Sequence, residues 1–125
     1  TAAPSHQPGL VLLVEDNLDL RSSVRDMLTE LGHSVVEASS VFEARALWDG
    51  LPDIALILSD LVLQGEETGL DLGAHALRTQ TPMYFMTSLP PSHDLHQRAT
   101  QIAPVIPKPF AGETLSKFLT SKDVL

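Results

Sequence analysis

Five ionisable or hydroxyl side chains follow short apolar runs of this sequence and have the types needed for chemistry on a phosphoryl group. They are Glu15 and Asp16 after residues 10–14, Asp60 after residues 54–58, Thr87 after residues 83–86, and Lys108 after residues 104–106. A carboxylate can attack phosphorus, while a bound cation, an ammonium and a hydroxyl neutralise and orient the oxygens of the transferred group. The pattern therefore indicates phosphoryl transfer to an aspartate, if the fold brings these side chains together.

The three carboxylates of Glu15, Asp16 and Asp60 would repel one another at a shared site. Clustered like charges raise carboxyl pKa values or require a cation, and a hard divalent ion such as Mg²⁺ prefers oxygen ligands. Taken alone, Asp60 is either a helix cap, a metal ligand or a nucleophile. Glu15 and Asp16 alone could be carboxylates that favour a helix N-terminus. The full set of residues favours the functional interpretation.

The elements that must position these residues alternate between strand and helix. Apolar runs predict strands at 10–14, 34–37, 54–58, 83–86 and 104–106, and helical spacing predicts helices at 20–31, 41–50, 69–80, 92–101 and 115–119. The run from Ile54 to Leu58 is typical of a strand buried on both faces. Five β-α repeats predict an α/β fold, a doubly wound, mostly parallel sheet with helices on both faces. The carboxyl edge of such a sheet is where ligands bind.

Polar residues mark where several of these helices begin. Asp16 or Asn17 can cap the first helix, and Ser40 with Glu43 fits a capping box at the start of the second. Trp48 lies on the apolar face of the second helix, where core packing is a commoner role than ligand stacking.

The composition limits the class of protein. The chain has 125 residues, and we assign 9–122 to one domain, 1–8 to a flexible lead-in and 123–125 to a tail. Sixteen acidic and eight basic residues give a formal charge of −8, which disfavours direct binding to nucleic acid or to an anionic membrane surface. The chain has no membrane-length apolar run, no visible secretory signal and no cysteine. These features are compatible with the cytoplasm, where we expect the chain to act.

Four short motifs resemble the receiver domain of two-component response regulators. They are Val14-Glu15-Asp16, Ser59-Asp60, Thr87 and Lys108-Pro109-Phe110, and they follow the first, third, fourth and fifth predicted strands. Each motif alone is weak, but all of them in this order form a specific signal across residues 10–119. The resemblance implies a flavodoxin-like (βα)5 fold with strand order 2-1-3-4-5.

The resemblance also implies a role for each residue at the metal and acceptor positions. Asp60 would be the phospho-acceptor and a ligand of Mg²⁺. Asp16 would bind the metal directly and Glu15 through water, and the backbone carbonyl of Val62 would be a further ligand.

Two further residues and the partners follow from the same resemblance. Thr87 would be the switch hydroxyl that hydrogen-bonds a phosphoryl oxygen, and Lys108 would pair with the phosphoryl group, on a Lys108-Pro109 bond that can be cis. A histidine kinase or a histidine phosphotransfer domain would supply the phosphoryl group. Phosphorylation would then shift the domain between two conformations. The domain would modify only itself, so we do not expect an enzyme in the usual sense.

Several positions depart from the usual pattern of the family. Gln64 stands where proline is common, and Val105 stands at the position of an aromatic switch residue. The segment from Asp60 to Gly69 is one residue longer than in chemotaxis-type members, and the layout Asp60…Gly65…Gly69-Leu70-Asp71-Leu72 resembles receivers fused to hybrid sensor histidine kinases. We therefore expect the receiver of a hybrid kinase.

Other functions compete with this interpretation. A stand-alone single-domain response regulator would carry the same residues. A degenerate receiver that only docks partners would explain Gln64 and Val105, but it would not need the acids, Thr87 and Lys108. A metal-dependent phosphatase commonly has a second acid two residues after its nucleophile, where this chain has Val62, and a cap over its substrate.

The lifetime of the phosphorylated state depends on what orients a hydrolytic water. Val62 lies two residues after Asp60, and Leu89 lies two residues after Thr87. Both side chains are apolar and cannot orient water. We therefore expect slow self-dephosphorylation.

Overall fold

Strands and helices alternate along the whole of the described chain, in agreement with the predicted β-α repeats. The computed structural model describes residues 9–51 and 53–121, so the predicted lead-in and tail lie outside the described residues. The elements in order are β1 (Leu10–Val14), α1 (Leu18–Glu30), β2 (Ser34–Ala38), α2 (Val41–Gly50), β3 (Ile54–Asp60), α3 (Gly69–Thr79), β4 (Met83–Thr87), α4 (Asp94–Thr100), β5 (Val105–Pro107) and α5 (Gly112–Ser121).

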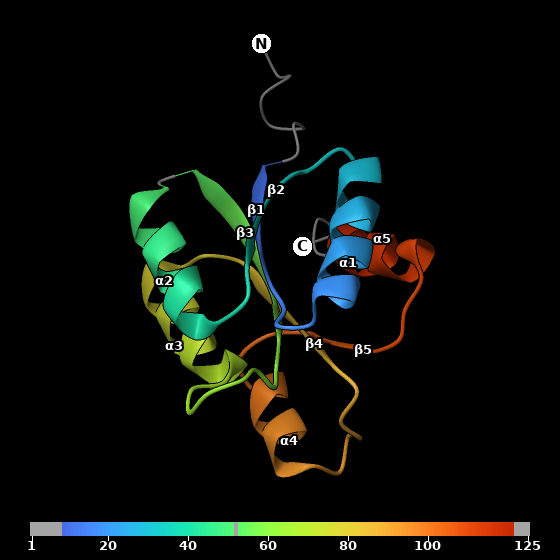
Figure 1. Cartoon of the computed structure of the whole chain (residues 1–125). Helices are drawn as coiled ribbons and strands as arrows, with labels where there is room; N and C mark the ends of the chain where they lie inside the picture. Colours follow the sequence, from blue (N-terminus) through green and yellow to red (C-terminus); the bar gives the residue numbers. More distant parts are fainter. Residues whose placement is uncertain (1–8, 52, 122–125) are drawn as a thin grey trace.

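The five strands form one parallel sheet in the order β2-β1-β3-β4-β5. This confirms the predicted flavodoxin-like α/β fold and its strand order. Helices α1 and α5 cover one face of the sheet, whereas α2 and α3 cover the other (Figure 1). Because every crossover returns the chain to the same end of the sheet, the carboxyl ends of the strands meet at the lower edge of Figure 1, beside α4.

Each face of the sheet has its own apolar core. Along β1, Leu12 and Val14 belong to the cluster under α2 and α3, while Val11 and Leu13 belong to the cluster under α1 and α5. All four side chains have no exposed surface. Burial of such side chains contributes about 1.5 to 3 kcal/mol each, so the two clusters hold the strand ends in register.

The prediction that β3 is buried on both faces along its whole length is wrong for its first half. Ala55 is exposed, and Ile54 is only half-buried, whereas the strand is fully buried from Ile57 onward. The reason is the register, because β4 pairs with β3 only from Ile57, which lies opposite Met83. The strand also runs two residues further than predicted, to Asp60.

The helix caps show which polar residues act locally. Asn17, not Asp16, caps α1 by accepting a hydrogen bond from the Leu20 N–H at 3.0 Å. The Asp16 carboxylate is therefore not used as the cap of α1 and can interact with groups at the carboxyl edge of the sheet.

The predicted capping box of α2 forms only by half. The Ser40 hydroxyl accepts a hydrogen bond from the Glu43 N–H at 3.1 Å, as a capping box requires. The Glu43 carboxylate, however, accepts from the N–H and the hydroxyl of Ser39, both at 2.7 Å, and not from the Ser40 N–H. Helix α3 starts with a capping box that was not predicted from the sequence. The Thr68 N–H donates to Asp71 Oδ2 at 2.8 Å, and the Thr68 hydroxyl accepts from the Asp71 backbone N–H.

Residues 61–68 form a tightly closed loop between β3 and α3, here called the β3–α3 loop. The Gly69 N–H donates to the Leu61 carbonyl at 2.9 Å and closes the loop at its base. Leu61 and Leu63 are buried, at 0% and 5% exposure, so both anchor the loop in the core. The chain has little freedom directly after Asp60.

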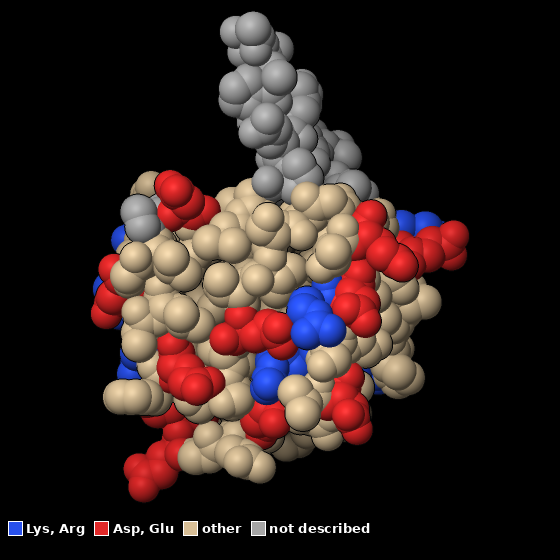
Figure 2. Space-filling view, turned by 45° about the horizontal axis from the view of Figure 1, so that its top comes forward, with Lys and Arg blue, Asp and Glu red and all other residues tan. Residues whose placement is uncertain are grey.

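The charged side chains are mixed on the visible surface. In the view of Figure 2, a few basic side chains lie near the middle of the face, and acidic side chains surround them. None of the helices between residues 9 and 121, residue 52 aside, is long and apolar enough to cross a membrane.

The close approach at the base of the β3–α3 loop predicts that Gly69→Ala destabilises the protein. The added Cβ would lie 2.5 Å from the Asp60 carbonyl oxygen, so the backbone must shift, at a cost of about 1 to 3 kcal/mol. Gly50→Ala is the matched control, because a Cβ at Gly50 meets nothing within 4 Å. Urea unfolding followed by Trp48 fluorescence measures both variants. Equal midpoints for the two would contradict the prediction.

Candidate functional site

The predicted functional residues all lie at the carboxyl edge of the sheet. Glu15 follows β1, Asp60 ends β3, Thr87 ends β4 and Lys108 follows β5. Glu15, Asp60 and Thr87 have exposures of only 1%, 6% and 2%. The sheet thus brings together side chains that are up to 93 residues apart in sequence.

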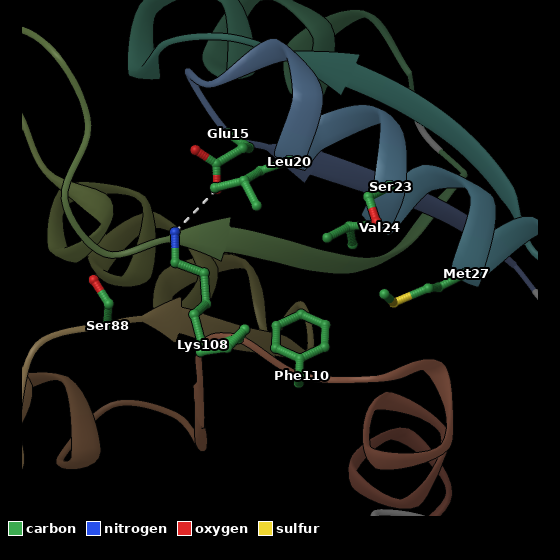
Figure 3. A pocket seen from close by; sticks show the side chains of 9 residues that line it. Glu15, Leu20, Ser23, Val24, Met27, Ser88, Lys108 and Phe110 are labelled. Carbon is green, nitrogen blue, oxygen red and sulfur yellow. Dashed lines mark hydrogen bonds and ion pairs between the residues drawn. The ribbon is translucent and has the colours of Figure 1, made fainter.

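Lys108 lies between two buried carboxylates. Its Nζ is 3.2 Å from Glu15 Oε1 and 3.2 Å from Asp60 Oδ2. Figure 3 shows the lysine side chain reaching toward Glu15 from the turn after β5. The Lys108-Pro109 bond is cis, as the resemblance suggested, and the Lys108 N–H donates to the Thr87 carbonyl at 2.9 Å.

The three predicted acidic residues form one cluster. A carboxylate oxygen from each of Glu15, Asp16 and Asp60 lies within 4.8 Å of the others. One lysine cannot neutralise three carboxylates, and their oxygens are the donors that a hard divalent cation prefers. The residues present therefore fit Mg²⁺. Val62 lies at the start of the β3–α3 loop with 47% of its surface exposed, and the role of its carbonyl stays a prediction.

The electrostatics of the site reflect this excess of negative charge. Burial and the nearby charge of Asp60 raise the pKa of Glu15 from an ordinary 4.5 to about 7. Burial likewise raises the pKa of Asp60, although Lys108 partly offsets this effect. Burial alone would lower the pKa of Lys108, but the charges of Asp60 and Glu15 outweigh it and raise that pKa. Both buried acids thus resist ionisation without a further positive charge.

The hydroxyl of Thr87 is held by its own loop. Its Oγ1 accepts a hydrogen bond from the Leu89 N–H at 3.1 Å. A hydroxyl that accepts one hydrogen bond can still donate its own hydrogen, so Thr87 remains able to bind an anionic oxygen.

Two residues that support the acidic pair were not predicted from the sequence. The Arg21 Nη1 donates to the Glu15 carbonyl at 2.9 Å, and its Nε pairs with Glu37 at 3.1 Å. The Gln64 backbone N–H donates to Asp16 Oδ2 at 3.0 Å. Arg21 could have been suspected as a basic residue in the helix that follows the acids. The Gln64 contact could not have been predicted from the sequence, because every residue except proline has a backbone N–H.

A groove of about 380 Å³ opens beside Lys108, between α1 and the turn after β5 (Figure 3). Its walls are mainly apolar and include Leu20, Val24, Met27 and Phe110. Glu15 and Lys108 line its polar end, so the groove leads to the acidic cluster.

A comparison with protein families matches residues 11–120 to the response regulator receiver domain. The chain belongs to this family. Receiver domains are signalling modules, and they bind Mg²⁺ through acidic residues of the kind clustered here.

Solved structures of other receiver domains have the same fold. This receiver domain is 28% identical to the chemotaxis protein CheY4 of Vibrio cholerae, with a TM-score of 0.76 over 91% of this chain and 98% of that one. It is 28% identical to the signal receiver domain of a modulated diguanylate cyclase from Desulfovibrio desulfuricans G20, with a TM-score of 0.80 over 91% and 92%. NtrX from Brucella abortus, at 24% identity, has a TM-score of 0.79 and is matched over 94% of this chain but 27% of its own, which shows the fold alone. The comparison with curated proteins found no match.

The raised pKa of Glu15 predicts how the stability of the metal-free receiver domain depends on pH. Folding favours the protonated form of the Glu15 carboxyl group. The free energy of unfolding that this group contributes is therefore largest below pH 4.5, and it is lost as the pH rises through about 7. Glu15→Gln cannot ionise and keeps Lys108 paired with Asp60. At pH 8 in a chelator, we expect it to be more stable than wild type by about 1 to 3 kcal/mol.

Urea unfolding at pH 5 and pH 8 measures this difference. Glu66→Gln is the control, since Glu66 is an exposed residue of the β3–α3 loop. If Glu15→Gln and wild type lose stability equally between the two pH values, the assignment of the pKa to Glu15 is wrong.

Proposed function

We propose that this receiver domain accepts a phosphoryl group on Asp60 from a histidine kinase or a histidine phosphotransfer domain, in a reaction that requires Mg²⁺. The observation that carries the proposal is the buried carboxylate of Asp60, which Lys108 contacts at 3.2 Å and which shares its site with Glu15 and Asp16. Such a set can bind and orient a phosphoryl group without any further chemical apparatus.

The transfer forms one O–P bond and breaks one N–P bond. A carboxylate oxygen of Asp60 attacks phosphorus on a phosphohistidine, the N–P bond breaks, and the imidazole nitrogen leaves with the electron pair. Mg²⁺ would be held by Glu15, Asp16, Asp60 and the Val62 carbonyl, and when bound it would neutralise charge on the carboxylates and the phosphoryl oxygens. Lys108 stays beside the acceptor oxygen and binds the oxygens of the transferred group.

Thr87 then couples the acyl phosphate to the loop after β4. Its hydroxyl donates to a phosphoryl oxygen while it still accepts from the Leu89 N–H, so Leu89 follows when Thr87 moves. Leu89 packs against the core cluster under α2 and α3, as Val105 does. Because Val105 is not aromatic, the movement passes through Leu89 instead of through the rotation of a ring.

The groove beside Lys108 provides a surface for the phosphodonor. A donor histidine reaches Asp60 only if its protein covers the carboxyl edge of the sheet. Leu20, which is 42% exposed, and Phe110 line the groove next to that edge. An apolar face of a donor helix would bury both residues.

We further infer that this domain comes from a hybrid sensor histidine kinase and works in the cytoplasm. The longer β3–α3 loop supports this origin, with its Gly65 and the Thr68–Asp71 capping box. The charge of −8 and the mixed surface of Figure 2 weigh against direct contacts with nucleic acid or membrane. Reading the gene upstream of Thr1 tests the origin, because a hybrid kinase requires a kinase domain there.

Phosphorylation of Asp60 is predicted to be direct and dependent on Mg²⁺. Wild type incubated with acetyl phosphate and Mg²⁺ should gain one phosphoryl group by intact-mass spectrometry, and a chelator should prevent this. Asp60→Asn should gain none, whereas the control Asp53→Asn, at an exposed aspartate before β3, should label normally. Binding of Mg²⁺ without any labelling of wild type would instead favour a docking module.

The phosphorylated state is predicted to be long-lived, because Val62 and Leu89 offer no group that orients water. Val62→Asn supplies a hydrogen-bonding side chain at a position that is 47% exposed and should shorten the half-life severalfold. Val62→Ala, which stays apolar, should not. Loss of the phosphoryl group with time gives the half-life. A wild-type half-life of seconds that Val62→Asn leaves unchanged would refute the prediction.

A further inference from the structure

We propose that the backbone N–H of Gln64 positions the Asp16 carboxylate for the uptake of the divalent cation. This inference rests on the proposed function, since it concerns the same acidic cluster. Gln64 is a positioning residue that acts through Asp16, and only its main-chain N–H is involved.

The contact joins two loops at the carboxyl edge of the sheet. The Gln64 N–H lies 3.0 Å from Asp16 Oδ2 and links the β3–α3 loop to the segment between β1 and α1, 48 residues away. Asp16 is the least buried member of the acidic cluster, so its side chain has the most freedom to lose when it binds a cation. A hydrogen bond to one carboxylate oxygen removes that freedom in advance and leaves the other oxygen for the metal.

The donor itself is held in place by its loop. Leu63, the preceding residue, is buried in the core cluster under α2 and α3. Glu67 on the other side forms an ion pair with Arg45 of α2 at 2.7 Å. The Gln64 N–H is therefore presented from a backbone that the buried Leu63 anchors directly next to it, whereas the Gln64 side chain is exposed.

The residue type at this position decides whether the donor exists. The family that the sequence resembles commonly has proline here, and proline has no N–H. Glutamine supplies a donor that proline cannot supply, so the departure at Gln64 adds a support to the acidic cluster and does not mark a degenerate site.

The test compares two substitutions that differ in the backbone donor. Titration calorimetry with Mg²⁺ on chelator-treated protein should show wild-type affinity for Gln64→Ala, which keeps the N–H. Gln64→Pro, which removes it, should bind about tenfold more weakly. Equal affinities for the two variants would overturn this inference and leave the proposed function intact. Failure of wild type to bind Mg²⁺ would overturn both.

A second measurement avoids any disturbance of the loop by proline. Hydrogen exchange of the Gln64 amide, followed by NMR in metal-free buffer, should be at least tenfold faster in Asp16→Ala than in wild type, because the acceptor is lost. Asp16→Asn keeps an acceptor oxygen and should exchange at an intermediate rate. Equal rates in all three proteins would overturn the inference.

Discussion

The contact of one lysine with two buried carboxylates is the interaction on which the rest of this structure depends. Lys108 neutralises part of the charge of Glu15 and Asp60, and the remaining negative charge stays buried at the sheet edge. Buried charge without a partner is costly, and here that cost is tolerated because two apolar clusters hold the strands. The site therefore keeps an excess of negative charge, which a bound cation would neutralise.

Contacts from helix α1 and from two loops give the site a defined geometry. Arg21 fixes the backbone at Glu15, the Leu89 N–H holds the Thr87 hydroxyl, and Gln64 holds Asp16. These contacts come from separate elements, so the site is supported on several sides at once. Preorganisation of this kind lowers the entropy that must be lost when a ligand binds.

The fold and the meeting of Glu15, Asp60 and Lys108 at one edge of the sheet could be predicted because they follow from strong local signals. Apolar runs ending in Asp60 or Thr87 mark strands, and the parallel connection brings their ends together. The uncovered start of β3 was not predictable, because it depends on where Met83 of β4 pairs. The Gln64 contact depends on loop geometry, and the Arg21 contact depends on which acceptors the fold brings beside α1. The Glu43 carboxylate accepts hydrogen bonds from Ser39 and not from the Ser40 N–H, which is a choice between adjacent donors. None of these is encoded in periodicity.

The near-neutral pKa of Glu15 has one more consequence. Burial and the neighbouring Asp60 make this carboxyl group hold its proton more tightly than an ordinary glutamic acid, and a nearby positive charge would favour release of the proton. A proton and a cation are therefore alternative partners for the same buried negative charge, and a cation bound to the acidic cluster would be held more weakly as the medium becomes more acidic.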